Sequence, residues 1–166
     1  MRKLETRFLT RLSETTSANE LTGIAVPYNE LSHPIPGAGR SFREKIAPGA
    51  LSYDANTVML TQHDQRGIPL ARVGAGTLTF RETPNGLEFS AKLPENRADI
   101  REAFERGDLD GSMSIGFYVE EDGDRWTHGK KSSMREVTRG HIVEISAVVQ
   151  GAYPAALAHY GGQSND

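Results

Sequence analysis

Residues 78–93 read LTFRETPNGLEFSAKL and indicate the fold most clearly. Apolar and polar residues alternate with a period of two on both sides of Asn85 and Gly86, which is the pattern of two strands with one buried face each. Asparagine and glycine tolerate the positive φ that tight hairpin turns require. The segment therefore predicts a β-hairpin with Asn85 and Gly86 at its turn.

The rest of the chain extends this β pattern. A single segment, residues 95–111, has helical spacing. Asn96 is its candidate N-cap, and Gly107 is its candidate stop. The 17 glycines among 166 residues exceed the average share of about 7% and are typical of a turn-rich β fold. The pattern predicts a mostly β fold with few helices. Besides the hairpin, we expect strands over residues 21–29, 58–62, 73–80, 111–122 and 142–149, and a short strand at the start of segment 41–51, SFREKIAPGAL.

Length and composition limit the domain organisation and the partners. A chain of 166 residues can bury its own core, so we expect one domain at 21–156, a flexible N-terminal segment at 1–20 and a flexible tail at 157–166. The net charge of -3, with scattered basic residues, argues against a nucleic-acid partner. Without cysteine, the chain has no disulfide, thiolate nucleophile or cysteine-ligated zinc. No apolar run approaches the roughly 20 residues that span a bilayer, and the N-terminus lacks the apolar core of a signal peptide, so we expect no membrane association.

Residues 111–122, GSMSIGFYVEED, form the predicted strand with the most distinctive chemistry. In an extended chain, Ser112 and Ser114 project from the same face, and either could be a nucleophile. A serine hydroxyl needs a base, and the base needs an acceptor that fixes its tautomer. His63 ends the apolar stretch VMLTQH, and Glu144 interrupts the apolar run IVEISAVV, where a carboxylate needs a partner. His63, Ser114 and Glu144 are therefore the candidate catalytic residues.

Each of these residues also has a purely structural interpretation. His63 fits an exposed loop histidine, Ser114 an ordinary strand serine, and Glu144 a solvent-facing carboxylate on an edge strand. His141 and Glu144 would form a metal pair on a helix, but extended geometry sends them to opposite faces, so we expect no metal. The acidic turn at 120–124, EEDGD, leaves a glycosidase with paired carboxylates open.

Five segments together resemble the prohead protease family of tailed bacteriophages. In chain order and across residues 21–156, they are FREKIAPGAL, VMLTQHD, TPNGLEFSAKL, RGDLDGSMSIGF and IVEISAVVQGAYPAA. The family is similar in fold to the herpesvirus assemblins. The resemblance therefore implies a small, mostly antiparallel β-barrel with a few flanking α-helices and a serine protease site.

The resemblance also implies roles for individual residues. The family's histidine followed by aspartate falls on His63, and its Ser-x-Gly-aromatic element falls on Ser114. The acid of its Glu-[Val/Ile]-Ser element falls on Glu144. Because the assemblins use a second histidine as the third member of their site, His141 is the alternative to Glu144.

The oxyanion hole is expected in the loop that follows the last strand. By analogy with the assemblins, the backbone of Gln150 and Gly151 would donate to the oxyanion. The chain departs from the family at this place, because it has QGAYPAA where proline and alanine commonly follow the strand directly.

For function, the resemblance implies an endopeptidase of phage head maturation that needs no cofactor. Its substrates would be the scaffold protein or a scaffolding segment of the major capsid protein, and the protease itself. It would act inside the assembling prohead in the host cytoplasm, and a homo-oligomer is compatible with this role. Two alternatives stay open: a non-catalytic capsid-assembly or scaffold module, and a carboxylate-dependent glycosidase. Both predict that replacement of Ser114 by alanine changes nothing.

Overall fold

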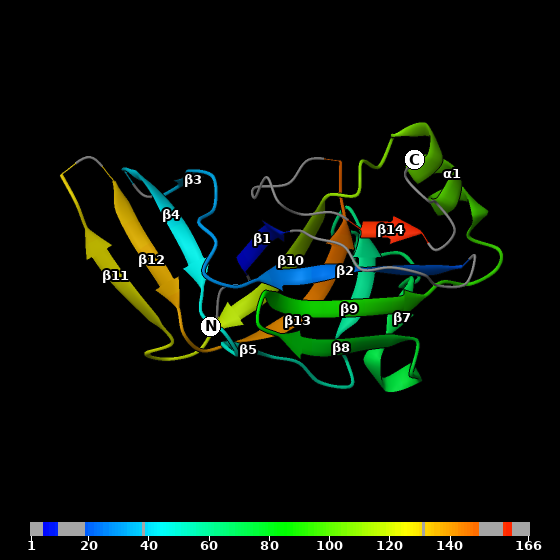
Figure 1. The fold of residues 1–166 in the computed structure, drawn as a ribbon, viewed down its shortest axis with the longest axis horizontal. Helices are drawn as coiled ribbons and strands as arrows, with labels where there is room; N and C mark the ends of the chain where they lie inside the picture. The colour runs from blue at the N-terminus through cyan, green and yellow to red at the C-terminus, as the bar shows by residue number, and fades with distance from the viewer. Residues whose placement is uncertain (1–4, 10–18, 38, 131, 150–157, 161–166) are drawn as a thin grey trace.

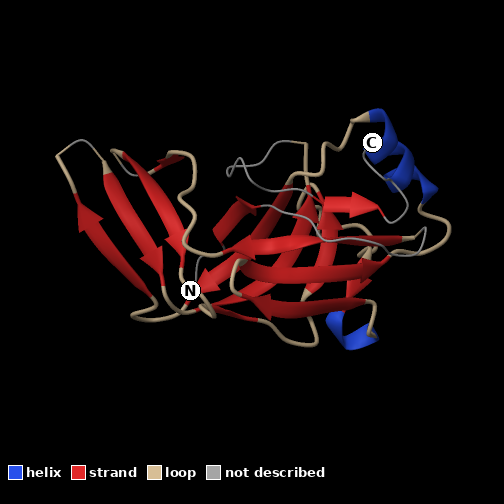
Figure 2. Cartoon of the chain, in the orientation of Figure 1, coloured by secondary structure: helices blue, strands red, loops and turns tan. Residues whose placement is uncertain are grey.

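The computed structural model of the chain describes residues 5–9, 19–37, 39–130, 132–149 and 158–160 (Figure 1). These residues are mostly β, with one α-helix, α1 (Ala98–Arg106), and a short 3-10 helix, η1 (Val73–Ala75) (Figure 2). The predicted mostly β class is therefore confirmed. No helix of the described residues has the length and apolar character that crossing a bilayer requires.

The strands form three sheets. The central sheet has the order β1-β10-β13-β6-β7, and β5 also pairs with β13. Its strands, in chain order, are β1 (Glu5–Leu9), β5 (Leu51–Ser52), β6 (Val58–Thr61), β7 (Ala71–Arg72), β10 (Met113–Val119) and β13 (Gly140–Ala147).

The other two sheets are arranged differently around the central one. The second sheet projects to the left in Figure 1 and consists of β11 (Asp124–His128), β12 (Ser133–Val137), β4 (Ser41–Ile46) and β3 (Ile35–Pro36), in this spatial order. The third sheet crosses over β10 and β13 in Figure 1 and consists of β14 (Ala158–Tyr160), β2 (Glu20–Pro27), β9 (Gly86–Lys92) and β8 (Leu78–Thr83).

One hydrophobic core joins the three sheets. Fully buried apolar side chains come from the central sheet (Ile115, Phe117), the second sheet (Ile46) and the third sheet (Leu21, Leu87). Burial of each such side chain contributes about 1.5–3 kcal/mol. Because Ile115 and Phe117 point into this core, the alternate residues of β10 face the other side of the central sheet. The core therefore determines which face of β10 is available for a site.

The expected barrel is not found: among the described residues, the three sheets are open. After β7, the chain passes through η1 and a left-handed Gly76 (φ 67°) and enters β8 of the third sheet, so it does not continue around the central sheet. The single strand expected over 73–80 is interrupted at the same place. The pairing is also more mixed than expected, since β13 runs parallel to β5 and β6, and β12 runs parallel to β4.

The predicted helix is confirmed as α1, with a different start. Its N-cap is Arg97 rather than Asn96, and no side chain caps it. Gly107 ends the helix in the left-handed conformation (φ 78°), and its N–H donates to the carbonyl of Phe104. Ile100 is buried, so the amphipathic face packs on the core as its spacing predicts.

The predicted hairpin is confirmed as β8 and β9, but its turn lies one residue earlier. Thr83 pairs with Gly86, which leaves Pro84 and Asn85 at the turn. Proline presets a negative φ at the first turn position, and neither Asn85 nor Gly86 has the positive φ that was expected. Glycine is required at 86 for another reason: a Cβ there would lie 2.4 Å from the carbonyl oxygen of Val26 on β2.

Seven strands were not anticipated, of which β3, β5 and β7 have only two residues each. β1 and β14 lie within the segments 1–20 and 157–166 that were expected to be flexible, and each pairs with a strand of the domain. β11 and β12 form an antiparallel hairpin in a polar stretch. Such short strands contain too few residues for a periodicity to be recognised. The limits of the domain itself stay a prediction.

A buried ion pair links three strands of the second sheet. Arg135 on β12 contacts Glu44 of β4 at 3.2 Å and Asp124 of β11 at 2.6 Å. Glu44 is fully buried, and it lies directly opposite Arg135 in the register. Since a carboxylate without a partner is costly in such a place, the contact stabilises this alignment of β4 and β12.

We expect Arg135→Ala to lower the free energy of unfolding by about 3–5 kcal/mol, because it leaves Glu44 buried without its guanidinium partner. Urea denaturation of the purified chain measures this loss. Arg125→Ala is the matched control, because Arg125 is exposed on β11 and its replacement should cost less than about 0.5 kcal/mol. Equal losses for the two variants would contradict a specific role of the ion pair.

Candidate active site

The antiparallel pairing of β10 with β13 brings two predicted site residues onto one face. In the register, Ser114 lies opposite Ser146, and Gly116 lies opposite Glu144. Because side chains two residues apart on a strand share a face, these four residues form one patch on the central sheet. It lies on the side opposite the buried Ile115.

His63 reaches this patch from the neighbouring strand. β6 pairs with β13 and ends at Thr61, and the N–H of Gln62 still donates to the carbonyl of Ala147 at 2.9 Å. Gln62 and His63 then both have a left-handed backbone, with φ of 51° and 57°. This conformation costs a non-glycine residue on the order of 1–3 kcal/mol and is found preferentially at functional sites. At these two residues the chain turns away from the direction of β6, and the turn places His63 beside Glu144.

Two hydrogen bonds connect the three predicted residues. His63 Nε2 lies 2.6 Å from Ser114 Oγ, and His63 Nδ1 lies 2.5 Å from Glu144 Oε1. A carboxylate can only accept, so Nδ1–H donates to Glu144, and Nε2 accepts the proton of the Ser114 hydroxyl. Ser114 and Glu144 are buried, whereas a quarter of the His63 side chain is exposed (25%). The Ser114 hydroxyl therefore lies within hydrogen-bond reach of the imidazole.

This arrangement can activate a hydroxyl group. The histidine is oriented by the acid, and its second nitrogen faces the serine proton, which is the geometry of a serine nucleophile with its general base. The His63 edge is the part of the set that reaches the surface.

His141, the alternative to Glu144, lies elsewhere. Its Nδ1 is 3.0 Å from the Ser52 hydroxyl, and its Nε2 is 3.4 Å from Asp54. A bulge between Gly116 and Phe117 shifts the register, so that His141 lies opposite Tyr118 at the far end of β10. In this structure Glu144, and not His141, contacts the second nitrogen of His63.

Ser112 is not part of the hydrogen-bonded set. It precedes β10, its N–H donates to Asp110 at 2.8 Å, and its carbonyl accepts from Val148 at 2.9 Å. The carboxylate of Asp64, the residue after His63, is bound by Arg66. The side chain and N–H of Arg66 hydrogen bond to its carboxylate and hold the pKa of Asp64 below its ordinary value.

Two residues at the site were not recognised for their roles in the sequence. A Cβ on Gly116 would lie 2.5 Å from Glu144 Oε1, so only glycine leaves room for the carboxylate. The Ser146 hydroxyl donates to Glu144 Oε2 at 2.6 Å. The available signal was the period-two spacing, which places Ser146 on the same face as Glu144 and Gly116 on the same face as Ser114.

Two further expectations concern the oxyanion donors and metal binding. The proposed oxyanion donors, Gln150 and Gly151, lie outside the described residues. Within the described ranges, no group of three or more histidine, aspartate and glutamate side chains is arranged to hold a metal ion.

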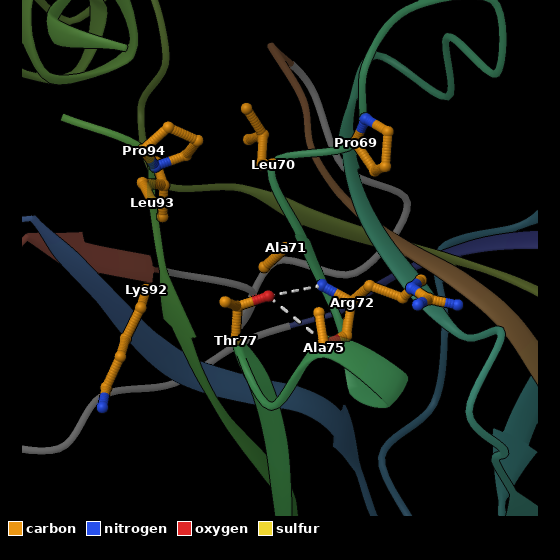
Figure 3. A pocket seen from close by; sticks show the side chains of 9 residues that line it. All are labelled: Pro69, Leu70, Ala71, Arg72, Ala75, Thr77, Lys92, Leu93 and Pro94. Carbon is orange, nitrogen blue, oxygen red and sulfur yellow. Dashed lines mark hydrogen bonds between the residues drawn. The ribbon is translucent and has the colours of Figure 1, made fainter. Parts of the chain in front are cut away.

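A cavity of about 370 Å³ lies apart from this site, beside β7 and the end of β9 (Figure 3). The Thr77 hydroxyl is engaged with the backbone of Arg72, and the charged ends of Arg72 and Lys92 point away from each other. The cavity contains no residue of the His63 set. Its lining residues are Pro69, Leu70, Ala71, Arg72, Ala75, Thr77, Lys92, Leu93 and Pro94.

The chain was compared with known proteins. The sequence model of the family described as Caudovirus prohead serine protease matches residues 5–164, which is nearly the whole chain. No curated protein and no solved structure matches the chain significantly. The family match includes all of the strands that surround His63.

Gly116→Ala tests the space that Glu144 needs. The added Cβ should displace the carboxylate and lower the rate at which a fluorophosphonate probe labels Ser114 by roughly 10²-fold. Gly67→Ala is the control, because no atom lies within 4 Å of a Cβ at that position. Unchanged labelling of a folded Gly116→Ala protein would show that the carboxylate position is unimportant for the reactivity of Ser114.

Proposed function

The chain belongs to the Caudovirus prohead serine protease family, and we propose that Ser114 is its nucleophile, His63 its general base and Glu144 the acid that orients the base. Family membership makes the protein a serine protease of capsid maturation. The observation that carries the assignment of residues is the pair of hydrogen bonds from Ser114 through His63 to Glu144, at 2.6 and 2.5 Å.

The proposed reaction begins with proton transfer from Ser114 Oγ to His63 Nε2. The oxygen attacks the carbonyl carbon of a peptide bond, and a tetrahedral intermediate forms. His63 then gives its proton to the leaving amine, and the acyl group stays on Ser114. A water molecule that loses its proton to His63 hydrolyses this ester and restores the hydroxyl.

Glu144 contributes without exchanging a proton. Its carboxylate keeps Nδ1 of His63 protonated, so that Nε2 is the nitrogen that accepts. When the imidazole takes up the serine proton, the nearby negative charge stabilises the imidazolium. The burial of Glu144 strengthens this interaction, because little water screens it.

The oxyanion of the tetrahedral intermediate needs backbone donors. We retain the N–H groups of Gln150 and Gly151 as the proposed donors, because they come a few residues after the end of β13, the strand that carries Glu144. Donors in this place would lie close in the chain to the residues that orient the base.

The proposed substrates are the scaffold protein or the scaffolding segment of the major capsid protein, together with the protease itself. Cleavage would take place inside the assembling prohead in the host cytoplasm, and the enzyme would need no cofactor. Self-cleavage near one end of the chain and a homo-oligomeric state belong to the same proposal. No observation favours a carboxylate-dependent glycosidase or a non-catalytic scaffold module.

Ser114→Ala should abolish cleavage of co-expressed capsid protein, with a loss on the order of 10⁴-fold or more in rate. The variant should still fold, because it lacks only one oxygen atom. Ser112→Ala is the matched control and should keep substantial activity, since the hydrogen bonds of Ser112 join its backbone to Asp110 and Val148. Full activity of Ser114→Ala with loss in Ser112→Ala would move the nucleophile two residues upstream.

Glu144→Gln tests the third member of the set. We expect a decrease of roughly 10³- to 10⁴-fold in the rate of capsid-protein cleavage, because the imidazolium loses its counter-charge. His141→Gln serves as the control and should retain nearly full activity, since His141 contacts Ser52 and Asp54 instead. The reverse result, loss only in His141→Gln, would transfer the role to His141.

A further inference from the structure

We propose that Ser146 is a positioning residue, which holds the acid and the backbone of the base in one closed hydrogen-bonded ring. The inference rests on the proposed function, because it concerns the same site. It assigns no contact with the substrate to Ser146. Instead, Ser146 determines how precisely Glu144 and His63 are held relative to Ser114.

Ser146 is buried among the groups that it connects. Ser146 Oγ donates to Glu144 Oε2 at 2.6 Å and accepts from the backbone N–H of His63 at 3.2 Å. The residue is fully buried. Both contacts are therefore formed within the protein and not through an exposed side chain that water could replace.

The donors and acceptors at Ser146 allow one orientation of the hydroxyl. The backbone N–H of His63 can only donate, so the Ser146 oxygen accepts from it. The Glu144 carboxylate can only accept, so the Ser146 proton points to Oε2. The other carboxylate oxygen, Oε1, accepts from Nδ1–H of His63. The ring thus leads from the backbone of His63 through Ser146 and Glu144 back to the imidazole of His63.

The ring meets a structural need at this place. Gln62 and His63 both have a left-handed backbone, which non-glycine residues adopt only where the surroundings hold them. Ser146 binds the N–H of His63 itself, so it supports the backbone at the turn. It also fixes the second oxygen of Glu144, which prevents rotation of the carboxylate away from Nδ1.

Ser146 and Ser114 lie opposite each other on neighbouring strands, yet their hydroxyls differ in what they can do. The Ser114 proton faces a nitrogen that can take it up. The Ser146 proton faces a carboxylate, and its oxygen already accepts from an amide. Ser146 is therefore suited to positioning, and Ser114 is suited to attack.

Three replacements of Ser146 separate hydrogen bonding from packing. Ser146→Ala removes the hydroxyl, and Ser146→Cys keeps a side chain of similar shape with only a weak donor. We expect both to lower the rate of Ser114 labelling by a fluorophosphonate probe about 10- to 100-fold. Ser146→Thr keeps the hydroxyl and should restore most of the rate. Ser52→Ala is the control, because its hydroxyl binds His141 outside the ring and its labelling should be unchanged.

A spectroscopic measurement distinguishes positioning from general destabilisation. The downfield proton resonance of the hydrogen bond between His63 Nδ1 and Glu144 should shift or broaden in Ser146→Ala and Ser146→Cys at temperatures where both are folded. It should stay unchanged in Ser52→Ala. A resonance and a labelling rate equal to those of the unmodified protein in Ser146→Ala would overturn the inference. If Ser146→Thr does not fold, the Ala and Cys variants still decide.

The same experiment separates this inference from the proposed function. If Ser114→Ala is labelled as fast as the unmodified protein, the assignment of the nucleophile is wrong, and the role of Ser146 fails with it. If Ser114→Ala is not labelled while Ser146→Ala and Ser146→Cys react at the full rate, the proposed function stands and only the inference about Ser146 is wrong.

Discussion

The register between β10 and β13 is the constraint on which the site depends. It places Ser114 opposite Ser146 and Gly116 opposite Glu144, all on one face of the central sheet. A slip by one residue would send these side chains into the core and bring apolar ones to the site. The hydrophobic core prevents this slip, because Ile115 and Phe117 of β10 fill its centre. The packing of one face of the strand thus secures the chemistry of the other.

Two buried glutamates show how the surroundings determine the use of a carboxylate. Glu44 is paired with Arg135, whose positive charge compensates it and links strands of the second sheet. Glu144 instead contacts an imidazole and a hydroxyl, at 2.5 and 2.6 Å. Its negative charge is therefore not neutralised by a guanidinium, and under the proposed mechanism it stabilises the imidazolium. Glycine at 116 makes room for this arrangement.

Much of the local structure could be predicted from the sequence, because it depends on neighbouring residues. Alternation identified the strands of the 78–93 hairpin, and helical spacing with Gly107 identified α1. The turn of the hairpin was misplaced by one residue, because position 86 requires glycine for its close contact with β2 and not for a positive φ. The open sheets and their parallel pairs were not predicted, since no local pattern shows which strands become neighbours.

For the site, the sequence by itself determined the kinds of residue and the faces they share. Three features can be recognised without a structure: a serine in an alternating strand, a histidine at a strand end and a glutamate in an apolar run. Only the tertiary structure decided that Glu144, and not His141, meets His63, and that Ser146 closes the ring between them. The physical reason is that the hydrogen bonds from His63 to Glu144 and Ser146 join residues that are 81 and 83 positions apart in the chain. Their existence depends on strand order, a bulge and a left-handed turn, which arise when the whole domain packs.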